Sequence, residues 1–189
     1  MTETTEPTAG DSGMWNRLLK ALAEIVAAID DNLAAGRELP ALLLLYAGID
    51  LLAWLEAPGD QTELRGSDFK SWCLRYLLPE SGLECNANEL WAARCALLHN
   101  AAAEARELRK AGTRTIVYTS AANRPETAAV AASDAKAECR TVAVAALRDA
   151  FQQAVTRHCE EFDRPDMPTA REAALLRRAA RVLDGWSRA

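Results

Sequence analysis

Arg94 and His99 are two residues whose types and spacing could act together on a phosphodiester. They lie in the segment "LWAARCALLHN", residues 90–100, whose apolar spacing predicts a helix. On a helix with ~3.6 residues per turn, five residues separate two side chains by about 140°, so both can border one groove. A histidine transfers protons near neutral pH, and a guanidinium stabilises charge on a phosphorane. Such a pair needs no metal and no cofactor when the nucleophile is the 2′-hydroxyl of RNA.

Arg94 also has a purely structural interpretation, because it falls in the middle of an apolar helix face. Arginine is rarely fully buried without a partner, although it can extend its head to water along its alkyl stem. Asp50 is the only charged residue between Leu39 and Leu55. Two charges that are each isolated on an apolar helix can neutralise one another. The sequence leaves the structural ion pair and the phosphate site both open.

Two other residue pairs are weaker candidates for chemistry. Cys95 and His99, four residues apart, could share a metal ion or form a thiol–imidazole dyad. No second Cys/His pair is spaced to complete a zinc site, and a cysteine inside a helix is more often a small core residue. His158, the other histidine, lies beside Cys159 near the predicted end of a helix. We expect it to be partly exposed there, where a helix C-terminus favours a cation.

The last predicted helix has a basic side. Its arginines lie opposite an apolar face and comprise Arg177, Arg178, Arg181 and Arg188. A solvated face is the simpler interpretation, and a track for RNA phosphates is the alternative. Aromatic residues do not alternate with these arginines, so the sequence does not indicate a stacking platform for single strands.

Composition limits the class of protein. Half of the 189 residues are apolar, enough for one domain with a sizeable core, and the abundance of Ala and Leu favours helices. The net charge of −5 argues against general binding of nucleic acid or of an anionic membrane. Five cysteines without a CxxC pair favour a reducing compartment, and the acidic N-terminus is unlike a signal peptide. The longest apolar run is shorter than a membrane span needs. We therefore expect a soluble cytoplasmic protein.

The pattern along the chain predicts an all-α bundle of five or six helices. We expect a disordered tail over 1–13 and a single domain over 14–189, with helices at 14–35, 40–56, 67–78, 86–110, 133–161 and 169–186. Ser67 is the expected cap of the third helix, and Asn86 with Glu89 resembles a capping box. Residues 113–120 read as a strand or extended segment without a partner strand in the chain, followed by a linker. This strand could pair with a copy of itself.

The segment "RCALLHN", residues 94–100, resembles the R-x4-H motif of the HEPN superfamily. Members of this superfamily are all-helical, many are dimeric, and they occur as RNases in toxin–antitoxin and other defence systems. The preceding segments "YAGIDLLAWL" and "SDFKSWCLRYLLP" resemble a bacterial branch of HEPN-like proteins. The resemblance covers residues 41–99.

The resemblance implies a metal-independent endoribonuclease in which Arg94 holds the scissile phosphate and His99 performs acid–base chemistry. It places Asp50 opposite the motif as a supporting residue. It also implies a homodimer with a shared cleft, RNA as the substrate and an antitoxin as a candidate protein partner. Family members often have a polar residue directly after the arginine, where this chain has Cys95, and Asn100 is only a further supporting candidate. This departure favours the alternative, a non-catalytic HEPN-fold module that binds RNA, a nucleotide or a protein.

Overall fold

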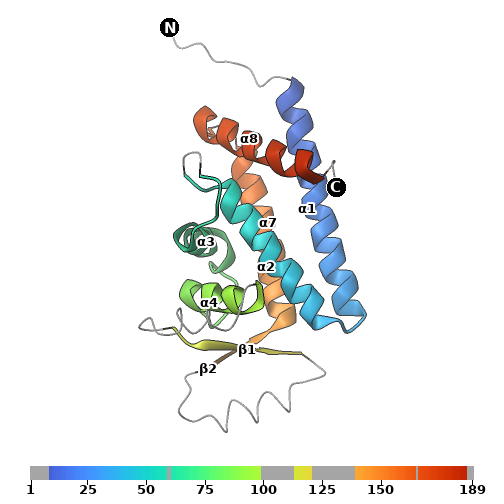
Figure 1. Ribbon diagram of the computed structural model, residues 1–189, viewed down its shortest axis with the longest axis vertical. Helices are drawn as coiled ribbons and strands as arrows, with labels where there is room; N and C mark the ends of the chain where they lie inside the picture. The colour runs from blue at the N-terminus through green and yellow to red at the C-terminus, as the bar shows by residue number, and fades with distance from the viewer. Residues whose placement is uncertain (1–8, 59–60, 99–112, 121–138, 165, 187–189) are drawn as a thin grey trace.

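The protein is a helical bundle with a short two-stranded sheet at one end (Figure 1). A computed structural model describes residues 9–58, 61–98, 113–120, 139–164 and 166–186. In these residues the α-helices are α1 (Ala9–Ala34), α2 (Glu38–Leu55), α3 (Gly66–Trp72), α4 (Ala87–Leu98), α7 (Val144–Phe162) and α8 (Thr169–Trp186). The π-helical turn η1 (Cys73–Leu77) extends α3. The predicted all-α bundle is confirmed.

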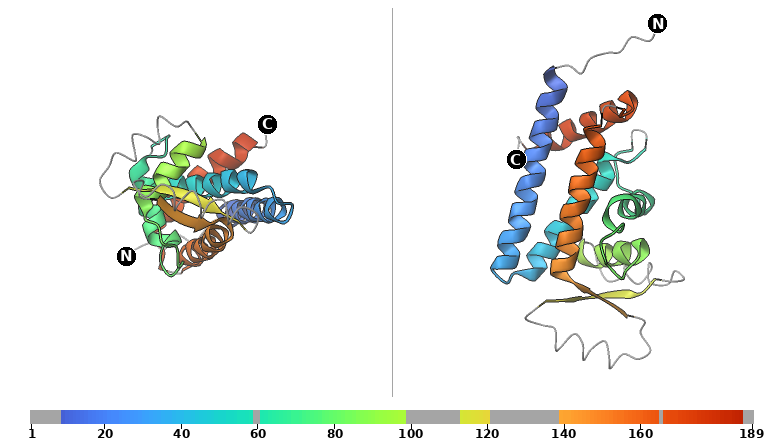
Figure 2. Two further views of the ribbon diagram at one scale, coloured as in Figure 1. Left: turned by 90° about the horizontal axis from the view of Figure 1, so that it is seen from below. Right: turned by 180° about the vertical axis from the view of Figure 1, so that it is seen from behind.

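Helix α2 is the centre of the bundle. It contacts α1, α3, α4, α7 and α8, and its fully buried side chains include Leu45, Tyr46, Ile49 and Leu52. Figures 1 and 2 show α2 between α1 on one side and α3 and α4 on the other. By length and a mean hydropathy of 1.6 it could cross a membrane, but half of it is buried inside the protein, and core helices pass the same test. Packing on several sides accounts for its apolar character.

The crossing of α2 and α7 depends on Gly48. A Cβ atom added to Gly48 would lie 2.5 Å from Cζ of Phe151, on α7. The phenyl ring therefore occupies the space that any larger residue would need. This contact sets how closely α7 approaches the central helix.

The strand predicted over 113–120 is present, but it has a partner in its own chain. Strand β1 (Thr115–Thr119) pairs in parallel with β2 (Cys139–Ala143), in the register Thr115 to Cys139 through Thr119 to Ala143. The prediction of a helix beginning at residue 133 was therefore wrong for residues 139–143, which form β2. Helix α7 begins at Val144. Thr141 and Val142 are β-branched, which favours a strand. This preference is weak by itself, and pairing with the distant β1 is what makes the segment a strand. Figures 1 and 2 place both strands beside the start of α7.

Other helix ends agree with the sequence to different degrees. Helix α1 begins at Ala9, inside the tail expected over 1–13, and α3 begins at Gly66 rather than after Ser67. The capping box is confirmed, since Glu89 Oε2 accepts from the Asn86 amide at 2.8 Å and Asn86 Oδ1 accepts from the Glu89 amide at 3.0 Å. The last helix spans 169–186 as predicted. The expected continuation of α4 to residue 110 lies outside the described residues.

Candidate functional site

Arg94 and Asp50 form an ion pair that joins α4 to the central helix α2. Arg94 Nε donates to Asp50 Oδ1 at 3.1 Å and to Oδ2 at 2.9 Å, and Nη2 donates to Oδ2 at 2.6 Å. The side chains are 12% and 18% exposed, respectively. The pair inferred from two isolated charges on apolar helices is therefore present. This fork geometry fixes the orientation of the guanidinium more firmly than a single contact would.

The Arg94 guanidinium lies over the indole ring of Trp91, which is one helical turn earlier. Its central carbon is 5.0 Å from the ring centroid, within the range of a cation–π contact. Burial by itself would lower the pKa of Arg94, but the hydrogen bonds and negative charge of Asp50 outweigh it and raise the pKa. Arg94 is therefore a fixed cation at all physiological pH values.

Of the other residues in the predicted motif and its surroundings, Cys95 lies in the described part of the chain. His99 and Asn100 lie outside the described residues, because the part of the chain described in this region ends with α4 at Leu98. Cys95 is buried, with 2% of its surface exposed, as expected for a small core residue. Within the described part of the chain, no group of three His, Cys, Asp or Glu residues is arranged to hold a metal ion.

The arginines of α8 do not form one exposed track. Arg177 and Arg181 are exposed, but Arg178 is 5% exposed and donates through Nη1 to the Leu55 carbonyl at 3.0 Å. Leu55 is the last residue of α2, and terminal helix carbonyls lack a partner within their own helix. The prediction that Arg178 lies on an exposed basic side, as an RNA track would need, was therefore wrong, because this side chain binds the last carbonyl of α2. Arg188 lies outside the described residues.

His158 also differs from its sequence-based prediction. It was expected to be partly exposed, but it is 1% exposed, because α2, η1 and α8 contribute groups around it. Trp72 Nε1 donates to its Nδ1 at 3.4 Å, which places the proton of the neutral ring on Nε2. Burial lowers the pKa of His158 to about 4. Among the described residues Nε2 has no hydrogen-bond partner. A neutral histidine enclosed in this way has no access to a substrate.

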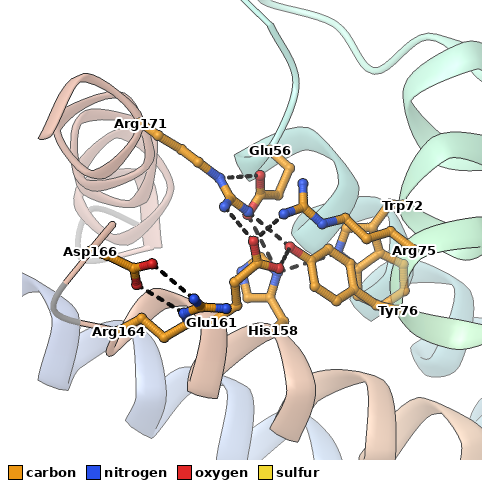
Figure 3. A network of polar contacts seen from close by, with 9 residues as sticks. All are labelled: Glu56, Trp72, Arg75, Tyr76, His158, Glu161, Arg164, Asp166 and Arg171. Carbon is orange, nitrogen blue, oxygen red and sulfur yellow. Dashed lines mark hydrogen bonds and ion pairs between the residues drawn. The ribbon is translucent and has the colours of Figure 1, made fainter. Parts of the chain in front are cut away.

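A closed network of ion pairs surrounds His158 (Figure 3). Arg171 on α8 donates from Nε and Nη2 to Glu56, the C-cap residue of α2, at 3.0 and 2.7 Å, and from Nη1 to Glu161 on α7 at 2.7 Å. The Tyr76 hydroxyl accepts from Arg171 at 2.8 Å and donates to Glu161 at 2.7 Å, while Arg75 pairs with the same carboxylate. Because these groups satisfy one another, the network joins α2, η1, α7 and α8. We interpret it as a structural clamp.

A small hollow borders this network. Its volume is about 220 Å³, and its lining includes Glu56, Asp68, Ser71, Trp72, Arg75 and Tyr76. Its charged and aromatic groups come largely from the clamp and the start of α3. The Arg94–Asp50 pair does not line this hollow.

The candidate site with chemistry beyond packing is therefore the end of α4, where Arg94 is fixed by Asp50 and Trp91. Its components come from α2 and α4, and the chain continues from α4 directly to His99. Comparisons with protein-family models, with curated proteins and with solved structures find no match to this chain.

Proposed function

We propose that this chain is a HEPN-like, metal-independent endoribonuclease of a toxin or defence type, active in the cytoplasm as a homodimer. The observation that carries the proposal is the orientation of Arg94. Its guanidinium lies on a helix face between the Asp50 carboxylate and the Trp91 ring, on the helix that leads into His99. A fixed cation beside a titratable histidine is suited to stabilise a phosphorane while protons move.

The proposed reaction is an internal transesterification of RNA. The 2′-oxygen attacks the adjacent phosphorus as His99 accepts the hydroxyl proton. The bond from phosphorus to the 5′-oxygen then breaks, and that oxygen takes a proton from a second, protonated imidazole, the His99 of the other subunit, which becomes neutral. The products are a 2′,3′-cyclic phosphate and a 5′-hydroxyl, and Arg94 offsets the negative charge that grows on the phosphoryl oxygens.

Asp50 has two opposing effects in this proposal. It orients Arg94 and favours its charged form, but it also neutralises part of the positive charge that a phosphate would meet. A phosphate would bind either beside Asp50 or by displacing it from the guanidinium. The latter case predicts that RNA binding and the Asp50–Arg94 contact compete.

A second function is favoured by the burial of the pair. Arg94 and Asp50 are both less than one fifth exposed, and Cys95 is buried where active HEPN proteins often have a polar residue. On this alternative the ion pair is structural, and the protein is a non-catalytic module that binds RNA, a nucleotide or a cognate antitoxin.

Assays on one RNA substrate in EDTA separate the two functions. For the enzyme, we expect cleavage by the wild type and none by His99→Ala, with RNA binding retained in that variant. Arg94→Lys should lose both the fork contact and most of the cleavage. Arg17→Ala, which removes an equal charge from a half-exposed side chain on α1, is the matched control and should cleave normally. Binding without cleavage by the wild type would support the module, and failure of both would exclude the enzyme and an RNA-binding module.

The dimer can be tested separately by light scattering at micromolar concentration. We expect twice the mass of one chain. A mass equal to one chain would leave the reaction without its second imidazole and would contradict the enzyme mechanism.

A further inference from the structure

Trp91 lies between Arg94 and the first turn of α3. The centroid of its ring is 5.0 Å from Cζ of Arg94. The centroids of the Trp91 and Phe69 rings are 5.3 Å apart. Residues three apart on a helix are neighbours on its surface, so α4 itself brings Trp91 beneath Arg94. Phe69 is fully buried, and it limits the movement of the indole.

Gly66 allows this position of the indole. A Cβ atom at Gly66 would lie 2.9 Å from Cε2 of Trp91 and 3.1 Å from both Cζ2 and Nε1. A side chain at position 66 would therefore push the indole, which has Phe69 beside it. The requirement for glycine here comes from close packing, since the Gly66 backbone does not adopt a left-handed conformation.

Asp50 and Trp91 restrict different motions of Arg94. Asp50 binds the edge of the guanidinium through Nε and Nη2, which sets the direction of the side chain. The central carbon of the guanidinium lies over the Trp91 ring, 5.0 Å from its centroid, so the indole restricts movement of the guanidinium on that side. Loss of the ring would leave the Asp50 contact in place but allow the guanidinium to move into the space that the indole occupies.

We propose that Trp91 is a positioning residue for Arg94, and that Gly66 is required so that the Trp91 ring can lie against α3. The inference rests on the proposed function only in assigning Arg94 to an RNA phosphate. The contact between the ring and the guanidinium can be tested without RNA.

The spectroscopic test uses the Nε–Hε signal of Arg94, identified by its disappearance in Arg94→Lys. In the wild type we expect the indole ring current to displace this signal. Trp91→Leu should move it toward the ordinary arginine position, and Trp91→Phe should retain part of the displacement. Trp54→Leu is the matched control, because it removes another half-buried tryptophan that lies 6.0 Å from an arginine, Arg178. An unchanged Arg94 signal in Trp91→Leu would overturn the proposal.

RNA binding then tests whether this contact matters for function. We expect Trp91→Leu to weaken RNA binding about two- to fivefold, the size of an exposed cation–π contact, and Trp91→Phe to restore most of the loss. Gly66→Ala should give an intermediate loss of RNA affinity. It replaces Trp91→Leu as the test variant if Trp91→Leu does not fold. Wild-type affinity in Trp91→Leu with a shifted Arg94 signal would refute the positioning role. Absence of RNA binding by the wild type would instead refute the proposed function.

Discussion

Replacing Asp50 by asparagine should destabilise the protein, because it leaves the Arg94 guanidinium largely enclosed without its counter-charge. Asp50 supplies both carboxylate oxygens to Arg94, at 2.6 to 3.1 Å. Breaking a fully buried pair costs about 3–5 kcal/mol. Water reaches 12% of the Arg94 side chain and 18% of Asp50, so we expect a smaller loss, about 2–3 kcal/mol.

A double-mutant cycle isolates the pair from the rest of the change. Asp50→Asn and Arg94→Gln are each expected to destabilise, and the double variant should lose about 1–2 kcal/mol less than the sum of the two. The free energy of unfolding is measured by urea denaturation, followed by circular dichroism. Asp166→Asn is the control, since it removes one partner of the exposed pair with Arg164 and should leave the midpoint unchanged.

Additive effects in this cycle would refute the reasoning, because the two charges would then not depend on each other. The reasoning would also be refuted if Asp50→Asn lowered the free energy of unfolding as little as Asp166→Asn does. A strong coupling together with normal RNA cleavage by Arg94→Gln would assign Arg94 to structure alone.

Two further predictions concern the bundle itself. The pKa of His158 is about 4 in the folded protein against an ordinary value of 6.5. Because the unfolded chain therefore binds the proton more tightly, the free energy of unfolding falls as the pH decreases from 6.5 toward 4. The full difference corresponds to about 3 kcal/mol, and urea denaturation of His158→Phe should show a flatter pH dependence over this range. Glu161, whose pKa is lowered from 4.5, acts mainly below this range, so an unchanged slope in His158→Phe would contradict the argument. Gly48→Ala should cost about 1–3 kcal/mol by thermal or urea unfolding, because its Cβ would overlap the Phe151 ring. Gly13→Ala, which meets open space on α1, should cost nothing, and equal losses in the two variants would contradict the packing argument.

The presence and order of the described helices were predictable because apolar periodicity and local capping specify them, although the start of α7 at Val144 was missed by eleven residues. Helix α8 has the predicted bounds, and the Asn86–Glu89 capping box lies where the sequence places it. Strand β2 was missed because five residues carry too little periodicity to indicate a strand. Its conformation depends on β1, which is separated from it by a long stretch of chain.

The surroundings of polar residues were less predictable. Asp50 and Arg94 could be paired because each is a single charge on an apolar helix. His158 and Arg178 have no such local signal, since their burial comes from elements distant in the chain: α3 and η1 for His158, and α2 for Arg178. Placing α8 against the end of α2 converts an expected surface arginine into a helix cap, and no local pattern specifies that placement.

In the proposed reaction, Arg94 and His99 promote attack of the RNA 2′-hydroxyl on the adjacent phosphate. The most direct measurement compares an RNA oligonucleotide with its 2′-deoxy counterpart in EDTA and identifies the product ends by mass spectrometry. We predict cleavage of the RNA only, with 2′,3′-cyclic phosphate and 5′-hydroxyl ends, and loss of both products in His99→Ala. Cleavage of the 2′-deoxy oligonucleotide, or equal RNA cleavage by wild type and His99→Ala, would contradict this reaction.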